Sequence, residues 1–418
     1  MGEKMIKTRE SGVKWLGRIP HKWNMIYGQY LYTIVTGKKD VNQGDVIGKY
    51  PFFTCSDEVK KINEYSFDCE ALLVAGNGMV GNTKYYNGKF DAYQRTYVLY
   101  DFNKKLINVE FLKLYVENLL TMSVKAKTSG SVIDFIKIGD IKKFEIVFPT
   151  KNNQDKIAKF LNKRIKVIDE LINKEKQQIE KLNDYKLLVI TDAVTKGINK
   201  KTTFKESGVK LIGKVPQHWD VKKVKFMVET ICKGNGIKKT DLRDDGNTLC
   251  IRYGEIYSKY NFKFENCISR TNKSLINKKV YIEYGDILCA GTGELVTEIG
   301  KNIVYLGKEK CLAGGDIIII RHKQDPNFLS YALNSIYAQN QKSIGKFKLK
   351  VVHISASDIG NVFLALPPTN EQREITSYID KKIDSINQVV ELKLKKINKL
   401  VEYKRSLIYE YVTGKKEV

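Results

Sequence analysis

The sequence predicts an α+β protein built from two similar halves, each a globular α/β domain followed by one long helix. The first observation is a repeated segment, because Glu10-Ser11-Gly12-Val13-Lys14 returns as Glu206-Ser207-Gly208-Val209-Lys210. The second is a long stretch with helical periodicity that starts at Gln154 and again at Gln372. This period far exceeds a solenoid repeat, so each half should be a whole domain plus a helix. The expected segments of this pseudo-two-fold repeat are 1–150, 151–197, 198–367 and 368–418.

The first globular segment has the pattern of strands and hairpins, since short apolar runs alternate with glycine and Asn-Gly pairs. Ala71–Ala75 and Thr96–Tyr100 predict strands, and Asn87-Gly88 between them predicts a turn. Val109–Met122 predicts a short amphipathic helix, and Pro149-Thr150 should end the domain.

The second globular segment keeps the landmarks of the first. The run Leu72–Gly78 matches Ile287–Gly293 in residue type and in the placing of its glycines. Between such landmarks the two sequences differ strongly. The two domains should therefore share a fold and present different surfaces.

Each globular segment is followed by a charged stretch whose apolar residues recur at steps of three and four, without proline or glycine. The first runs from Gln154 to Val194 and is stopped by Gly197, and the second runs from Gln372 to Val412. About forty residues of helix span roughly 60 Å. Neither apolar stripe can be buried alone, so the two helices should form a coiled-coil pair. The alternative to a functional role for this pair is that it serves only as a structural scaffold. The expected interface consists of Ile157, Leu161, Ile165, Ile168, Ile179, Leu182, Ile375, Ile379, Ile383, Ile386, Ile397 and Leu400.

The net charge of the 418 residues is +25, which favours binding to a polyanion. Nucleic acid is the stronger candidate, because no segment has the roughly 18 apolar residues that a membrane span needs. A lysine-rich solvated surface without any partner is the alternative. The seven cysteines lack zinc-site spacing and the four histidines are scattered, so we expect reduced cysteines, no metal site and a cytoplasmic protein.

No motif predicts a catalytic residue. Gly76–Gly81 fits the glycine pattern of dinucleotide-binding proteins, but that mechanism needs a helix directly after the glycines. Asn82–Gly88 has the pattern of a strand and a turn instead. A tight loop that lets the backbone approach DNA, or a plain turn, explains these glycines better.

Polar and basic residues in the globular segments are the candidates for DNA contacts. Gln94 and Arg95 can form paired hydrogen bonds with adenine and guanine, and loop lysines can neutralise phosphates. Any single one of them can instead be a solvent-facing residue, and the expectation is that some of the set contact DNA. The full set is Lys38, Lys39, Asn77, Lys84, Gln94, Arg95, Ser129, Ser131, Thr292, Lys346, Lys348 and Lys350.

The repeated boxes resemble those of a known family. The Glu-Ser-Gly-Val-Lys box, Pro367–Ile375 at the start of the second helix and Val412–Gly414 at its end are similar to segments of the DNA specificity subunit of type I restriction-modification systems. The resemblance covers essentially the whole chain, with the boxes in the same order.

The resemblance implies a non-catalytic DNA-recognition subunit. Two target-recognition domains would each read one half of a bipartite, asymmetric sequence in double-stranded DNA. The two helices would pack antiparallel, set the spacer between the half-sites and dock two methylase subunits, with two restriction subunits completing the complex. S-adenosylmethionine would be bound by the methylase subunits, ATP and Mg²⁺ by the restriction subunits, and no cofactor by this chain.

Two other functions remain open at this point. One is a self-contained DNA methyltransferase or nuclease with an unrecognised site, against which the missing cofactor motifs argue. The other is a coiled-coil assembly scaffold, which gives no reason for two domains with divergent surfaces.

Overall fold

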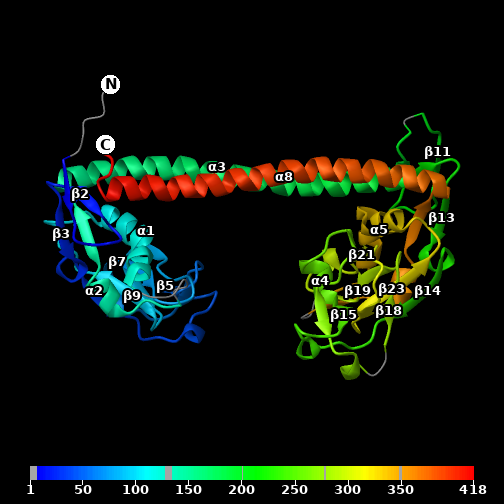
Figure 1. The fold of residues 1–418 in the computed structure, drawn as a ribbon, viewed down its shortest axis with the longest axis horizontal. Coiled ribbons are helices and arrows are strands. Elements are labelled where there is room, and N and C mark those ends of the chain that lie inside the picture. The colour runs from blue at the N-terminus through cyan, green and yellow to red at the C-terminus, as the bar shows by residue number, and fades with distance from the viewer. Residues whose placement is uncertain (1–6, 128–133, 200, 277–278, 348–350) are drawn as a thin grey trace. The chain divides into compact units, whose positions relative to one another are not determined.

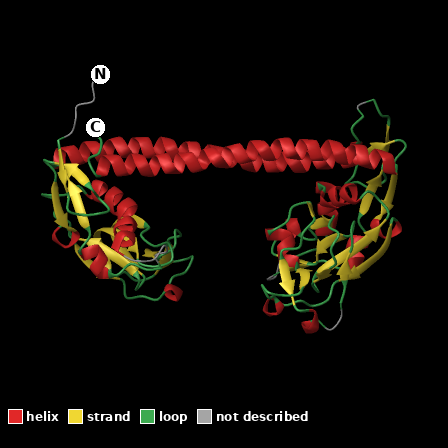
Figure 2. Cartoon of the chain, viewed as in Figure 1, coloured by secondary structure: helices red, strands yellow, loops and turns green. Residues whose placement is uncertain are grey.

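A computed structural model describes residues 7–127, 134–199, 201–276, 279–347 and 351–418, and it divides into two compact units. The first unit comprises residues 1–175 and 394–418, and the second comprises 176–393. Each unit therefore holds one globular domain, half of the first long helix and half of the second (Figure 1). Both helices and strands are plentiful in each, which is the α+β class that the sequence predicts (Figure 2).

The first domain is built around one six-stranded sheet with strand order β4-β9-β7-β8-β5-β6. Its strands are β1 (Thr8–Glu10), β2 (Arg18–Pro20), β3 (Asn24–Tyr27), β4 (Thr33–Thr36), β5 (Tyr50–Phe53), β6 (Lys60–Ile62), β7 (Phe67–Ala75), β8 (Thr83–Ala92), β9 (Thr96–Tyr100) and β10 (Glu145–Phe148). Its helices are α1 (Val109–Lys127) and α2 (Ile138–Lys142). The predicted strands and helix are thus present, with α1 five residues longer than expected.

The predicted turn at Asn87-Gly88 is wrong. Both residues lie inside β8, where Asn87 pairs with Glu70 and Gly88 with Cys69 of β7. The long antiparallel pairing of β7 with β8 outweighs the local turn preference, and Gly88 accommodates the irregularity with a φ of 129°. The chain turns earlier, between β7 and β8, at the Gly76–Gly81 loop.

The second domain has the same plan with its main sheet divided in two, of strand orders β14-β23-β19-β21-β16 and β17-β15-β22-β18. Its strands are β11 (Phe204–Glu206), β12 (Lys214–Pro216), β13 (Asp220–Lys223), β14 (Val228–Lys233), β15 (Thr248–Ile251), β16 (Lys263–Phe264), β17 (Ser269–Thr271), β18 (Tyr281–Ile282), β19 (Ile287–Ala290), β20 (Thr292–Gly293), β21 (Asn302–Tyr305), β22 (Cys311–Ala313), β23 (Ile317–His322), β24 (Val352–His353) and β25 (Phe363–Leu366). Its helices are α4 (Tyr253–Ser258), α5 (Pro326–Asn334), α6 (Ile336–Ser343) and α7 (Ala356–Gly360).

The division of the sheet has a local cause. In the first domain the single strand β8 pairs with β7 on one side and with β5 on the other. In the second domain its counterpart is interrupted, so β21 pairs with β19 while β22 pairs with β15. The two domains therefore share a topology, and the second carries extra residues between β15 and β19.

The long helices are α3 (Lys151–Lys196) and α8 (Thr369–Val412), and their halves run antiparallel within each unit. In the first unit Lys404 is paired with Asp169 at 2.8 Å, and the rings of Phe160 and Tyr411 lie 4.8 Å apart. In the second unit one apolar core contains Ile190 and Ala193 of α3 together with Ile375, Ile379 and Ile383 of α8. Of the twelve predicted interface residues, Ile165, Ile179, Leu182 and Leu400 are half-buried and the other eight are buried.

Helix α3 ends where the sequence predicts. Gly197 has a φ of 72° and donates its backbone N–H to the carbonyl of Ala193, which closes the helix. A Cβ at this position would lie 3.2 Å from the ring of Trp219, a fully buried core residue of the second domain. The end of the helix is therefore fixed both by backbone conformation and by packing.

The structure joins Cys267 and Cys311 by a disulfide, so the expectation of seven reduced cysteines is wrong for this pair. The two residues carry no spacing motif, and they meet because both are buried in the same apolar core of the second domain. Among the described residues no helix is long and apolar enough to cross a membrane.

Candidate nucleic-acid interface

A tightly held turn joins β8 to β9 in the first domain. This turn, residues 93–96, is closed by the N–H of Thr96, which donates to Tyr93 O at 2.8 Å. Two glycines hold the turn by backbone hydrogen bonds: Gly37 N donates to Thr96 O at 3.2 Å, and Gly76 N donates to Arg95 O at 2.9 Å. A Cβ on Gly37 would lie 1.9 Å from Ala92 O, and one on Gly76 would lie 2.6 Å from Arg95 O. We call residues 93–96 the first reading turn.

The first reading turn displays two of the predicted DNA-contacting side chains. Gln94 and Arg95 are both exposed, and they line a pocket of about 300 Å³ together with Asn77. The other wall of the pocket includes Phe135, which is 54% exposed, and the Lys137 ammonium lies 5.8 Å from the centre of its ring. The structure thus brings Asn77, Gln94 and Arg95 together and adds an aromatic and a basic residue.

Phe135 and Lys137 were not among the residues predicted from the sequence. They reach the pocket because Phe135 forms a bridge with Asn77, and Ile136 N donates to Gly76 O at 2.8 Å. This pairing joins segments about sixty residues apart in the sequence, and no local motif predicts it.

The predicted lysines of the first domain differ in exposure and in whether their ammonium groups already have a partner within the protein. Lys38 is exposed beside the first reading turn. Lys39 is half-buried and bonded to Glu64 at 2.8 Å, and this hydrogen bond raises the pKa of Lys39. Lys84 donates to the carbonyl of Ser56, and partial burial lowers the pKa of Lys84. Lys38 is therefore the better candidate for a phosphate contact.

The second domain contains a turn of the same construction. Residues 314–317, the second reading turn, are closed by Ile317 N donating to Gly314 O at 3.2 Å. Gly234 N donates to Ile317 O at 2.9 Å and Gly291 N donates to Asp316 O at 2.7 Å. These three bonds match those of the first turn one for one. The exposed residue of this turn is Asp316, which the sequence did not single out.

Six predicted residues remain, two in the first domain and four in the second, and only Thr292 and Lys346 of these lie within the described residues. Thr292 is buried in β20, and its hydroxyl lies 3.1 Å from Nδ1 of the exposed His353. Thr292 pairs with His353 as Asn77 pairs with Phe135, so His353 is the counterpart of Phe135. Lys346 is half-buried and paired with Asp358 at 2.8 Å. Ser129, Ser131, Lys348 and Lys350 lie outside the described residues.

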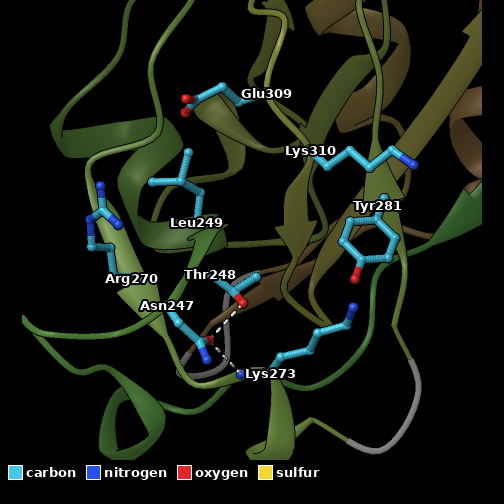
Figure 3. A pocket seen from close by; sticks show the side chains of 8 residues that line it. All are labelled: Asn247, Thr248, Leu249, Arg270, Lys273, Tyr281, Glu309 and Lys310. Carbon is cyan, nitrogen blue, oxygen red and sulfur yellow. Dashed lines mark hydrogen bonds between the residues drawn. The ribbon is translucent and has the colours of Figure 1, made fainter.

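A second surface pocket, of about 460 Å³, is lined by residues that include Thr248 and Leu249 at the start of β15 (Figure 3). The second reading turn lies at the other end of this strand, where Gly314 N donates to Ile251 O. Arg270 stands on one side of the pocket, and Lys273, Tyr281 and Lys310 stand on the other. Asn247 accepts hydrogen bonds from the Thr248 hydroxyl and from the backbone N–H of Lys273. The pocket is basic, with Glu309 as its one acidic lining residue, and its chemistry suits an anionic group.

A family model described as "Type I restriction modification DNA specificity domain" matches residues 27–181 and 216–399. The two matches cover most of the chain and correspond to its two halves. The chain belongs to this family. It is a DNA specificity subunit, a recognition component rather than a catalytic one, with two recognition domains.

Relatives across much of the length support this assignment. The chain is 27% identical over 390 residues to the Type I restriction enzyme EcoDI specificity subunit of Escherichia coli, covering 87% of this chain and 82% of that one. It is 25% identical over 420 residues to the Type I restriction enzyme MjaVIII specificity subunit of Methanocaldococcus jannaschii, covering 96% and 94%.

The fold is also found among solved structures. A chain from work on the assembly and conformational transition of a type I R-M system superposes with a TM-score of 0.66 at 14% identity. The match covers 95% of the specificity subunit and 99% of that chain. At this identity the likeness shows the fold alone.

Proposed function

We propose that the specificity subunit reads a bipartite sequence in double-stranded DNA, one half with each domain, through the surface around each reading turn. The observation that carries this proposal is the pair of turns, which have the same three backbone hydrogen bonds and different exposed side chains. A rigid backbone that carries variable polar side chains suits the direct readout of base edges. The excess of 25 positive charges suits contacts to the phosphates on either side.

A domain exchange tests this proposal. Residues 15–148 are replaced by the corresponding domain of another specificity subunit, and the DNA motif methylated by the resulting complex is determined. The half of the motif read by the first domain should change while the other half stays. A change in the retained domain's half, or in both halves, contradicts the modular reading.

The outer face of the helix pair is the proposed docking surface for the methylase subunits. The domain-facing side of α3 in the first unit is marked by Asp155, bonded to Asn108 at 2.6 Å, and by Asn162, bonded to Glu110 at 3.0 Å. Arg164 lies two residues beyond Asn162, about 200° further round the helix, so it points away from the domain. Leu171 follows Arg164 by seven residues, which is almost two helical turns, so it lies on the same outer side.

The outer face carries similar residue types in both units, and its residues are exposed. We define the outer face of the first unit as Arg164, Leu171, Lys399 and Tyr403, and that of the second as Lys382, Val389, Lys181 and Tyr185, in matching order. All eight are exposed, the two tyrosines by 56% and 50%. The domain-facing side keeps some counterparts, such as Gln154 and Gln372, and changes others, since Arg405 corresponds to Leu187. Two equal surfaces fit two copies of one partner.

Charge reversal on one outer face tests the docking proposal. Arg164→Glu with Lys399→Glu should reduce the bound methylase from two copies to one, and adding Lys382→Glu with Lys181→Glu should reduce it to none. The stoichiometry is measured by native mass spectrometry. Lys166→Glu is the matched control, because Lys166 is exposed on α3 but its counterpart is Asp384. Two bound copies in both outer-face variants would exclude this surface.

The remaining parts of the complex are proposed from the family. The methylase subunits bind S-adenosylmethionine, two restriction subunits bind ATP and Mg²⁺, and this chain binds no cofactor and acts in the cytoplasm. Among the described residues no group of three or more His, Cys, Asp or Glu side chains is arranged to hold a metal ion. The purified chain should transfer no labelled methyl group to DNA until the methylase is added, and transfer by the chain alone contradicts the proposal.

A further inference from the structure

The two reading turns carry side chains of opposite hydrogen-bonding character at the same structural position. The position is defined by the backbone, because its carbonyl accepts from Gly76 N in the first domain and from Gly291 N in the second. The residue there is Arg95 in one turn and Asp316 in the other. An arginine only donates hydrogen bonds, and an ionised aspartate only accepts them.

Both side chains are available to a ligand. Arg95 and Asp316 are exposed, and the side chain of neither makes a hydrogen bond or ion pair with another residue of the described ranges. Their backbones, in contrast, are fixed. A Cβ on Gly234 would lie 2.1 Å from Gly314 O and one on Gly315 would lie 3.0 Å from Gly236 N, so the second turn is as closely packed as the first. A fixed backbone with an unpaired polar side chain is pre-organised for recognition.

The chemistry of base edges in the major groove distinguishes the two residues. Guanine presents two acceptors, O6 and N7, which match the paired donors of an arginine. Cytosine presents the N4 amino group as a donor, which matches a carboxylate. Adenine presents an amino donor as well, but its N7 acceptor lies beside the donor and disfavours a carboxylate there. A carboxylate facing guanine or thymine would meet only acceptor atoms or a methyl group there, and it also repels the phosphates. Asp316 therefore contributes selectivity more than affinity.

We infer that Arg95 selects a guanine in the first half of the target and that Asp316 selects a cytosine in the second half. This inference rests on the proposed function, in which each domain reads one half-site. It assigns base preference to one residue of each turn.

The experiment is a selection of random duplex DNA by the complex of the chain with its methylase. The wild-type complex should enrich a two-part sequence with an invariant guanine in one half and an invariant cytosine in the other. Arg95→Ala should lower discrimination at that guanine by roughly 5- to 150-fold and leave the second half unchanged. Asp316→Ala should lower discrimination at the cytosine by about fivefold or more and leave the first half unchanged.

Matched controls and the unaltered half-site keep the test decisive. Lys105→Ala and Asp245→Ala remove exposed charges of the same two domains away from the turns and should change no base preference. Unchanged base preferences in the turn variants, or uniform weakening with a smaller salt dependence, overturn the inference, the latter because it marks a phosphate contact. If the wild-type complex nevertheless enriches a two-part DNA sequence, the proposed function is still supported. A wild-type complex that enriches no two-part sequence overturns both.

Discussion

At the scale of single residues, a buried cation without a carboxylate partner is a notable cost in the second domain. Lys342 of α6 is 2% exposed, and its ammonium donates to the carbonyls of Gly300 and Leu333 at 2.8 and 3.0 Å. Burial lowers the pKa of Lys342 from 10.5 to about 8. Beside it, Gln339 and Ser343 donate to Ile299 O and Val296 O, so one face of α6 holds the loop that follows β20.

The lowered pKa predicts a pH dependence of stability. The folded second unit binds the Lys342 proton less tightly than the unfolded chain does, so its free energy of unfolding should rise as the pH increases from about 8 towards 10.5. The Lys342→Met variant should lack this contribution. The difference in unfolding free energy between wild type and variant, measured with urea, should shift by about 2 kcal/mol between pH 7.5 and 9.5. An equal difference at both pH values contradicts the prediction.

Residue roles were only partly predictable from the sequence. Gln94 and Arg95 could be proposed because their types suit base edges and they precede a strand. Asp316 and Phe135 could not, because their positions depend on the β-bridges and glycine contacts that fix the two turns. Lys39 and Lys346 looked equal to other loop lysines, and only the structure shows Glu64 and Asp358 bonded to them.

At the scale of elements, the reading turns depend on glycines whose neighbours are backbone atoms. Gly37→Ala places a Cβ against Ala92 O, so the first turn must shift or the domain must lose roughly 1 to 3 kcal/mol of stability. We expect weaker binding to DNA, and loss of discrimination confined to the first half-site. Gly234→Ala should do the same for the second half-site.

The control for these variants is Gly139→Ala. Gly139 lies in α2 with nothing within 4 Å of an added Cβ, so this change should leave binding and selectivity unaltered. Competition binding with duplexes altered in one half at a time measures all three variants. If Gly37→Ala retains wild-type discrimination in the first half-site, the close packing of Gly37 against the first reading turn is not required for base recognition.

Elements were predicted well where periodicity is long and poorly where pairing decides. The forty-residue apolar stripes and Gly197 fix α3 to within a few residues at each end. The Asn87-Gly88 pair misleads, because β7 offers a full partner strand across it. The division of the second sheet depends on the interruption between β21 and β22, which has no clear sequence signal.

At the scale of the whole molecule, the helix pair is proposed to set the spacer between the half-sites. Near the boundary of the two units Lys396 is paired with Glu175 at 2.6 Å, and Lys393 is hydrogen-bonded to Gln178. Inserting one heptad after Glu175 and another after Lys393 preserves the apolar periodicity and leaves the contacts inside each unit in place.

This double insertion should lengthen the spacer by about three base pairs, since seven helical residues add about 10 Å and a base pair rises about 3.4 Å. Both half-sites should stay the same. The comparison is a variant with the insertion in α3 alone, which misaligns the helix pair and should abolish recognition. A methylated motif with the original spacer after the double insertion excludes a ruler function.

The internal repeat made the architecture of the whole molecule predictable, because both boxes and both helices appear twice in the same order. The repeat also explains why the target itself is not predictable from it. The residues retained between the halves form cores, helix contacts and the outer face, while the reading turns differ in the residues that face the solvent.

The most direct test is methylome sequencing of DNA from cells that co-express this chain with its cognate methylase subunit. The predicted result is a new split motif with a methylated adenine in each half and a fixed spacer between the halves. No new methylation, with both subunits soluble and in complex, would contradict the assignment of this chain as the subunit that gives the methylase its DNA sequence.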